Sequence, residues 1–263
     1  MRHLFSLVSA ALIAQVSAQC TLNILKAVTD DILAAQTSGK SAFSSLADTV
    51  SYTENRKKVD INTGVLSQAL KIDHNRSQHD VVQCATFSEF IVTNSAKPYV
   101  IVTTARLDNT SYKVNQIDSI ITTTGDWLFN VTGTYYWASR ENWNEIPEAQ
   151  RDTREVIKAA ADAYLDVFND KSVKVPWGSP CARLEGGAYT GRGQASDRCD
   201  VGVPSGVKLV NRQYVIDQNY GTVDVILDFG GPGGLPDSHE FRVEGGKLRY
   251  VHTLTSCGGR SCM

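Results

Sequence analysis

Apolar residues recur at helical spacing in two segments of the chain. "LKAVTDDILAAQ" begins at Leu25 and "IKAAADAYLDVF" begins at Ile157, an offset of 132 residues. Apolar positions three and four residues apart predict an amphipathic helix in each segment. Asp152 or Thr153 stands just before the second helix and is expected to cap its first turn.

Alternating apolar and polar positions follow each predicted helix and indicate β-strands. A helix followed by an antiparallel meander is the α+β pattern, in which the sheet curls and its inner face is covered by helices. Gly245 and Gly246 predict a hairpin turn between the last two strands. The strands are expected in "ATFSEFIVT", "YVIVTTARLD", "VNQIDSIITTTG", "TVDVILDF" and "SHEFRVEGGKLRYVHTLT".

The order of helix and strands repeats, which predicts a degenerate tandem duplication. "NRSQHDVVQCATFSEFIV" lies over "NRQYVIDQNYGTVDVILD" at an offset of 136, so that Arg76 falls on Arg212. The segment "SRENWNEIPEAQRDTREV" resembles a connector. We expect a first unit over residues 19–148 and a second over residues 149–263.

The first residues, "MRHLFSLVSAALIAQVSAQC", have the pattern of a signal peptide. A basic start precedes an apolar stretch, and small residues end at Ala18, where we expect cleavage. The apolar stretch is too short to cross about 30 Å of hydrocarbon as a helix. The sequence therefore predicts a protein of the secretory-pathway lumen or the cell exterior, with residues 1–18 removed and no membrane anchor.

The cysteines and sequons fit that compartment. Six cysteines are an even number that an oxidising environment can pair completely, and none of the spacings is the CxxC typical of zinc sites. Proximity along the chain suggests three disulfides: Cys20 with Cys84, Cys181 with Cys199, and Cys257 with Cys262. Candidate glycosylation sites, which must face water if used, are Asn75, Asn109 and Asn130.

Charge excludes some classes of partner. The chain has 26 basic and 28 acidic residues, a net charge of -2, and no basic run. Neither a nucleic acid nor an anionic membrane surface is favoured as a partner. Small apolar or neutral molecules are the expected ligands.

The stretch "IDHNRSQHD", residues 72–80, holds the densest candidate chemistry. If it is a strand with Asn75 facing solvent, the alternation sends His74 and Arg76 into the interior of the first unit. His74 could then move a proton near neutral pH, and Arg76 could hold an anionic oxygen. The alternation sends His79 to the other face, so a metal site is not expected. A structural role for Arg76, tying Asp80 or Glu54, stays open.

Glu54 and Glu185 lie 131 residues apart, each on the first strand expected after a helix. A carboxylate inside an apolar cone would have a raised pKa and could act as a general acid or base, while a salt bridge to Arg76 or Arg183 is the structural alternative. We take Arg76, His74 and Glu54 as candidate catalytic residues. The candidate substrate-binding residues are Tyr52, Trp127, Glu185, Arg212 and Tyr214. His239 and His252 are interpreted as ordinary core or surface histidines.

Several longer motifs carry a resemblance to a known family. They are "YTEN", "GVLSQALKIDHNRS", "TTTGDWLFN", "VPWGSPCARLEGG" and "GLPDSHEFRVEGGKLRYVHT". Over essentially the whole mature chain the sequence resembles a group of secreted fungal proteins, and each unit resembles an NTF2-like or SnoaL-like α+β cone. Because NTF2-like sheets often pair face to face, a homodimer and pairing of the two units within one chain both stay open.

The characterised members of that group are hetero-Diels-Alderases of tropolonic sesquiterpene pathways. The resemblance implies a secretory-pathway cyclase that joins a tropolone-derived ortho-quinone methide to a humulene-type olefin. Such a pericyclase needs no cofactor, because catalysis comes from holding the two reactants in one geometry. One scaffold can host many roles, so a non-catalytic secreted module that binds a small hydrophobic ligand or a cell-wall component is the alternative.

Overall fold

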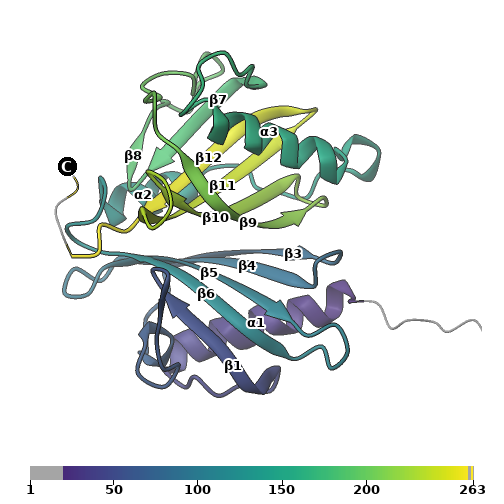
Figure 1. The fold of residues 1–263 in the computed structure, drawn as a ribbon, viewed down its shortest axis with the longest axis vertical. Helices are drawn as coiled ribbons and strands as arrows, with labels where there is room; N and C mark the ends of the chain where they lie inside the picture. The colour runs from purple at the N-terminus through teal and green to yellow at the C-terminus, as the bar shows by residue number, and fades with distance from the viewer. Residues whose placement is uncertain (1–19, 260–261, 263) are drawn as a thin grey trace, which may run out of the picture.

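The computed structural model describes residues 20–259 and residue 262 (Figure 1). The predicted signal peptide, residues 1–18, lies outside the described residues. The chain contains two six-stranded mixed sheets, each covered by its own long helix. The predicted α+β class is confirmed.

The first sheet has the strand order β2-β1-β6-β5-β4-β3. Strands β1 and β6 are parallel, and the other neighbours are antiparallel. The elements are α1 (Leu22–Ser38), β1 (Leu46–Glu54), β2 (Lys57–Lys58), the 3-10 helix η1 (Val65–Ser67), β3 (His74–Asp80), β4 (Ala85–Val92), β5 (Tyr99–Leu107) and β6 (Val114–Thr122).

The second sheet repeats this arrangement with the order β8-β7-β12-β11-β10-β9 and one parallel pair, β7 with β12. The same topology in both halves is what the predicted duplication requires. The elements are α3 (Arg154–Asp166), β7 (Trp177–Glu185), β8 (Ala188–Tyr189), β9 (Leu209–Asp217), β10 (Thr222–Phe229), β11 (Leu235–Glu244) and β12 (Lys247–Thr255). Between the two sheets along the chain come α2 (Val131–Ala138) and the 3-10 helix η2 (Glu148–Gln150).

The two long helices match residue by residue at the predicted offset of 132. Thr21 caps α1 and Thr153 caps α3, each accepting a hydrogen bond from a backbone N–H three residues on. Both helices bury the face that the spacing predicts. The matching buried pairs are Leu25 and Ile157, Val28 and Ala160, and Ile32 and Tyr164.

The strand offset of 136 that places Arg76 on Arg212 is wrong for β3. The hairpins β3–β4 and β9–β10 are equivalent. In the first, Asp80 pairs with Ala85 next to the turn, and in the second, Asp217 pairs with Thr222 next to the turn. The offset at these strands is therefore 137, and Arg76 corresponds to Gln213. A shift of one residue along a strand moves every side chain to the other face of the sheet.

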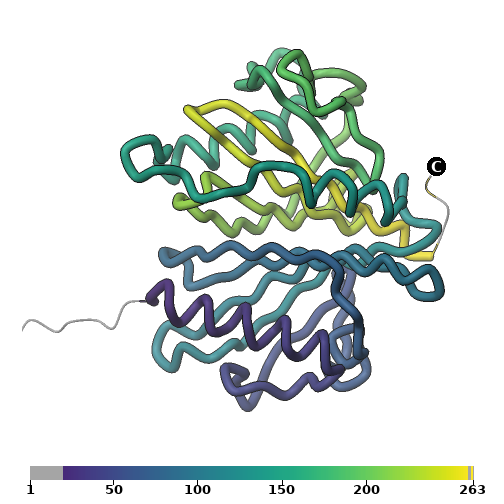
Figure 2. Tube along the Cα trace, turned by 180° about the vertical axis from the view of Figure 1, so that it is seen from behind, coloured from purple at the N-terminus to yellow at the C-terminus, as the bar shows by residue number. Residues whose placement is uncertain are grey.

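The two sheets stack on each other, with α1 and α3 on the outer sides (Figure 1). Figure 2 shows the same stacking from behind. Each helix packs against its own sheet around a separate apolar core. A third apolar cluster lies between the sheets and includes Phe87, Ile91, Val102, Leu184, Val215, Ile226 and Leu254. Face-to-face pairing thus takes place within the chain.

All three predicted disulfides are confirmed: Cys20 with Cys84, Cys181 with Cys199, and Cys257 with Cys262. This pairing fits a secreted protein. Within the described residues, no helix is long and apolar enough to cross a membrane.

Candidate functional site

The stretch "IDHNRSQHD" includes strand β3, but its faces are the reverse of the prediction. Asn75 is exposed, as expected for a glycosylation site. His79, however, points to the helix of its own unit, where its Nε2 lies 3.1 Å from the hydroxyl of Thr29 in α1. Arg76 therefore faces the second unit and not the interior of the first, so the predicted orientation of Arg76 is wrong.

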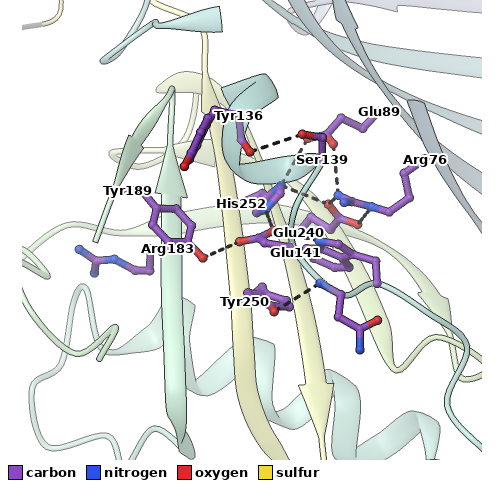
Figure 3. A network of polar contacts seen from close by, with 12 residues as sticks. Arg76, Glu89, Tyr136, Ser139, Glu141, Arg183, Tyr189, Glu240, Tyr250 and His252 are labelled. Carbon is purple, nitrogen blue, oxygen red and sulfur yellow. Dashed lines mark hydrogen bonds and ion pairs between the residues drawn. The ribbon is translucent and has the colours of Figure 1, made fainter. Parts of the chain in front are cut away.

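Arg76 joins the two units through buried carboxylates. Its Nη2 forms an ion pair with Glu240 of β11 and lies 3.2 Å from Oε2 of Glu89 in β4. Glu240 also accepts a hydrogen bond from Gln78, two residues along β3. The guanidinium carbon of Arg76 lies 3.7 Å from the centroid of the Trp143 ring. Figure 3 shows Arg76, Glu89 and Glu240 converging on one another.

His252 of β12 extends the same network. Its Nε2 lies 2.5 Å from Glu141, and its Nδ1 lies 3.4 Å from Glu89. Glu141 also accepts hydrogen bonds from Trp143 Nε1 and from the Tyr189 hydroxyl, both at 2.9 Å. Burial lowers the pKa of His252, but Glu141 and Glu89 outweigh it and raise this pKa to about 10. His252 is therefore protonated at neutral pH.

The two carboxylates beside Arg76 titrate far apart. Burial disfavours the charged form of Glu89, yet Arg76 and His252 hold its pKa at about 2. Burial raises the pKa of Glu240 to about 7, and the negative charge of Glu89 adds to the effect of burial. Among the described residues, Glu89, Glu141 and Glu240 form ion pairs with Arg76 and His252. Within this set of five the charge is closest to neutral when Glu240 holds a proton.

This interface network, defined by Arg76, Glu89, Glu141, Glu240 and His252, has no room for an organic substrate. The cavity beside it has about 10 Å³, enough for about one water molecule. Ligand atoms of Glu89, Glu240 and His252 lie within 4.8 Å of one another. The set does not fit a metal ion, because Arg76 already ion-pairs with both carboxylates and His252 is protonated.

Of the other candidate catalytic residues of the first unit, Glu54 has partners of its own, whereas His74 lies two residues before Arg76 on the same face of β3 and feels the charges of Arg76 and Glu89. The Tyr52 hydroxyl donates to Glu54 at 2.6 Å, and the backbone N–H of Val65 also donates to Glu54. Glu54 thereby holds the loop around η1. His74 contacts the edge of the Tyr135 ring, with centroids 6.5 Å apart, and burial lowers its pKa.

The candidate binding residues fall in three separate places. The Trp127 backbone bonds to Thr255 of the second unit. Glu54 and Glu185 end the equivalent strands β1 and β7, as their spacing of 131 predicts. Glu185 Oε1 lies 3.0 Å from Arg183 Nε. This ion pair is the salt bridge expected if Glu185 has a structural role and not a catalytic one.

Arg212 and Tyr214 lie together against α3. The Tyr214 hydroxyl donates to Asp162 at 2.7 Å, and Arg212 Nη2 donates to Asp166, also at 2.7 Å. Lys158 lies over the Tyr214 ring. These contacts fasten strand β9 to the helix, so both side chains already have structural partners.

A different pair, Asp237 and His239 of β11, has the arrangement of an acid–base site. Residues two apart on a strand share a face, and His239 Nδ1 contacts Oδ1 of Asp237. Asp237 Oδ2 accepts a hydrogen bond from Thr255 at 2.5 Å. Within the described part of the chain, no hydrogen bond or ion pair involves His239 Nε2. Asp237 thus fixes the tautomer that leaves Nε2 free to accept a proton.

Two further buried polar side chains belong to the interior of the second unit, Tyr164 of α3 and Arg183 of β7. The His239 ring lies 5.8 Å from the ring of Tyr164 in α3, centroid to centroid. The Tyr164 hydroxyl and Arg183 Nη1 are buried and have no hydrogen-bond partner among the described residues. Burial raises the pKa of Tyr164, while Arg183 opposes this. Unpaired buried polar atoms are rare and commonly mark a place for water or a ligand.

The first unit has none of these groups at the equivalent positions. Matching the sheets strand by strand places Ile101 and Thr103 of β5 where β11 has Asp237 and His239. The same comparison matches Ile32 with Tyr164 and Tyr52 with Arg183. The two units share a topology, but only the second has the dyad.

A hollow of about 410 Å³ lies against the end of α3 and the start of β7. Val167 lines it, and the next residue, Phe168, contacts the His239 ring at 6.2 Å between centroids. Gly202 lines it as well, and a Cβ at that position would lie 3.6 Å from Arg183 Nη2. The hollow is therefore one residue away from the His239 ring through Phe168, and Gly202 brings it close to Arg183.

The sequence analysis missed this pair, although a signal was present. In "LPDSHEF" an aspartate and a histidine stand at positions i and i+2 of a strongly alternating strand. That spacing places both on one face. The sequence could not show which face of β11 meets Tyr164 and which meets the first unit.

The comparisons with known proteins bear on the second unit. Residues 150–255 match a protein family described as a domain of unknown function, DUF8021. This range contains α3 and strands β7 to β12. A search of curated proteins gave no match for the chain.

Proposed function

We propose that the protein is a cofactor-independent acid–base catalyst whose site lies inside the second unit. The observation that carries this proposal is the Asp237–His239 pair with its free Nε2, whose ring lies 5.8 Å from the ring of Tyr164 between centroids. The buried side chain of Arg183 belongs to the same unit. A base, a hydroxyl donor and a fixed cation are the parts that a proton-transfer reaction at an oxygen requires.

Each group has a defined role in this proposal. His239 Nε2 removes a proton from the substrate, and Asp237 stabilises the imidazolium that forms. Arg183 stabilises the negative charge that develops on the substrate oxygen. Tyr164 donates its proton to the leaving hydroxyl and is reprotonated by His239.

For the substrate class we propose a hydroxymethyl tropolone, on the basis of the family resemblance. Removal of the ring hydroxyl proton and loss of the side-chain hydroxyl as water yield an ortho-quinone methide. Cycloaddition of this diene to a humulene-type olefin then requires no further proton transfer. The protein contributes by holding the two reactants in one geometry and by polarising the carbonyl through Arg183.

The finer features of the chain belong to the same proposal. We propose that each unit is an NTF2-like or SnoaL-like cone, with the first over residues 19–148 and the second over residues 149–263. The identical topology of the two sheets supports this division. We also propose that the protein enters the secretory pathway and is glycosylated; Asn75, Asn109 and Asn130 are all exposed.

The test is turnover by purified secreted protein given the hydroxymethyl tropolone and a humulene-type olefin, followed by mass spectrometry. His239→Gln and Asp237→Asn should each lower the rate about a hundredfold or more, the usual contribution of a general base. His79→Gln, in a buried histidine of the first unit, is the matched control and should keep the wild-type rate. Circular dichroism must show that all variants are folded. A folded His239→Gln protein with wild-type turnover refutes the proposed site.

A non-catalytic ligand-binding module is the second candidate. It is favoured by the low exposure of His239, which is 1% accessible. In that case the wild type and His239→Gln would bind the tropolone equally well, and neither would convert it.

A further inference from the structure

A second hollow, of about 350 Å³, lies over α2, the β8 region and β12. Its walls are strongly aromatic. Trp137 and Tyr189 stack with ring centroids 3.9 Å apart and planes 7° from parallel, and Tyr136 and Tyr250 also line it. The volume falls in the range of sites for small molecules.

Three arginines line the same hollow: Arg140, Arg192 and Arg249. Arg140 lies over the Tyr136 ring at 3.9 Å, and Arg249 lies over the Tyr250 ring at 4.0 Å. In the part of the chain that the structure describes, none of the three forms an ion pair with a carboxylate. Arg140 and Arg249 are therefore held against aromatic faces, and Arg140 also donates through Nη1 to the backbone carbonyl of Tyr136 at 2.7 Å. The donors that remain on the three arginines can meet another acceptor.

The two acids of this hollow are already satisfied. Asp197 accepts hydrogen bonds from the backbone N–H groups of Arg192 and Gln194 at 2.8 and 3.0 Å. Glu141 is neutralised from behind by His252, which lies 2.5 Å away and is protonated. The charge left over in the hollow is positive.

We propose that this hollow binds a small aromatic anion, with a planar apolar body and a carboxylate or enolate group. The tyrosine and tryptophan rings provide contact area for the body, and the arginine forks match the two oxygens of the anion. Glu141, which lines the hollow, belongs to the interface network together with Glu240. His239 and Glu240 are successive residues of β11, so they point to opposite faces of the sheet. The hollow is therefore separate from the dyad. The inference does not depend on the proposed reaction.

The probe is 1-naphthoate, compared with the uncharged 1-naphthamide of the same shape, with binding followed by calorimetry and tryptophan fluorescence. Naphthoate should bind at least about tenfold more tightly than naphthamide, since a charge-assisted pair contributes about that factor. Arg192→Gln and Arg249→Gln should each weaken naphthoate about tenfold and leave naphthamide unchanged.

Arg198→Gln is the control, because Arg198 is exposed and already paired with Asp200. It should keep the wild-type affinity for naphthoate. His239→Gln should keep it as well, which separates this site from the dyad. Equal affinities for the two probes, no naphthoate binding at about millimolar concentration, or insensitivity to both arginine substitutions would each overturn the proposal.

Discussion

At the residue scale, Arg76 shows that a shift of one residue along a strand changes which partners a side chain meets. The side chain is an arginine inside the molecule, as predicted, but it lies between the units against Glu89 and Glu240. Its partners come from β4 and from β11, which is far along the chain. An arginine that pairs with two buried glutamates from different units is part of the scaffold.

Arg76→Ala should therefore destabilise the protein more than it impairs catalysis. Removing one partner of a buried ion pair leaves an uncompensated charge and costs about 3–5 kcal/mol. Urea denaturation should show this loss in the free energy of unfolding. Arg198→Ala, at an exposed pair, should leave it almost unchanged, because exposed ion pairs contribute little to stability. A folded Arg76→Ala protein with wild-type stability and no turnover would instead restore Arg76 as a catalytic residue.

At the element scale, the irregular segment between β8 and β9 shapes both hollows. Arg192 and Asp197 line the aromatic one, and Gly202 and Val203 line the one beside α3. The disulfide between Cys181 and Cys199 fastens this segment to β7. Both cysteines are buried, so the link is protected from solvent. One covalent bond thus positions the walls of two candidate sites.

The double substitution Cys181→Ala and Cys199→Ala tests this arrangement. The disulfide spans a sequence separation of 18 residues, which corresponds to about 3 kcal/mol in the chain-entropy estimate. Thermal unfolding should show a clear fall in stability, and naphthoate affinity should fall with it. Peptide mapping of the native protein without reduction should recover the Cys181–Cys199 link. An alkylatable Cys181 in the native protein would contradict the pairing.

At the scale of the whole molecule, two sheets are joined across an interface that buries charge as well as apolar surface. The interface network lies among apolar residues such as Phe87, Leu184 and Leu254. Buried ion pairs contribute little net stability, because their attraction is offset by the loss of hydration. The apolar contacts hold the sheets together, and the charges make the contact specific and sensitive to pH.

The pH dependence of stability follows from the direction in which folding shifts the pKa of each group. Glu240 has a pKa of about 7 in the folded protein and 4.5 ordinarily, so its ionisation disfavours folding as pH rises from about 4.5 to 7. His252 has a pKa of about 10 against 6.5, so its contribution is complete below pH 6.5 and is lost towards pH 10. Glu89, with a pKa of about 2, stabilises the fold above pH 4.5 and loses its effect as pH falls towards 2.

We therefore expect the free energy of unfolding to fall between pH 5 and pH 8, and Glu240→Gln to make this fall smaller. The difference between the two proteins should change over that interval by on the order of 2 kcal/mol. Denaturant titrations at several pH values measure it. Parallel curves for the wild type and Glu240→Gln would show that Glu240 does not titrate in this window.

The sequence by itself determined the elements of this protein. Apolar spacing placed both long helices, and Thr153, one of the two residues expected to cap the second helix, does so. Alternation placed the long strands, and proximity along the chain suggested the three disulfides. The equivalence of Glu54 and Glu185 also followed from spacing alone. These features depend on local geometry and on short separations in sequence, which a single chain displays directly.

The tertiary structure alone decided which face of each strand meets which partner. Alternation predicts two faces of a strand but not what each face meets. The sequence therefore places Arg76 inside the first unit, although Arg76 joins the second, and favours an ordinary core or surface role for His239. A β-sheet covered on both sides is apolar on both faces, and the cue that marks the solvent side in an ordinary sheet is absent. Only the stacking of the two sheets determines whether a buried polar residue supports the interface, as Glu240 does, or faces the interior of its own unit, as His239 does.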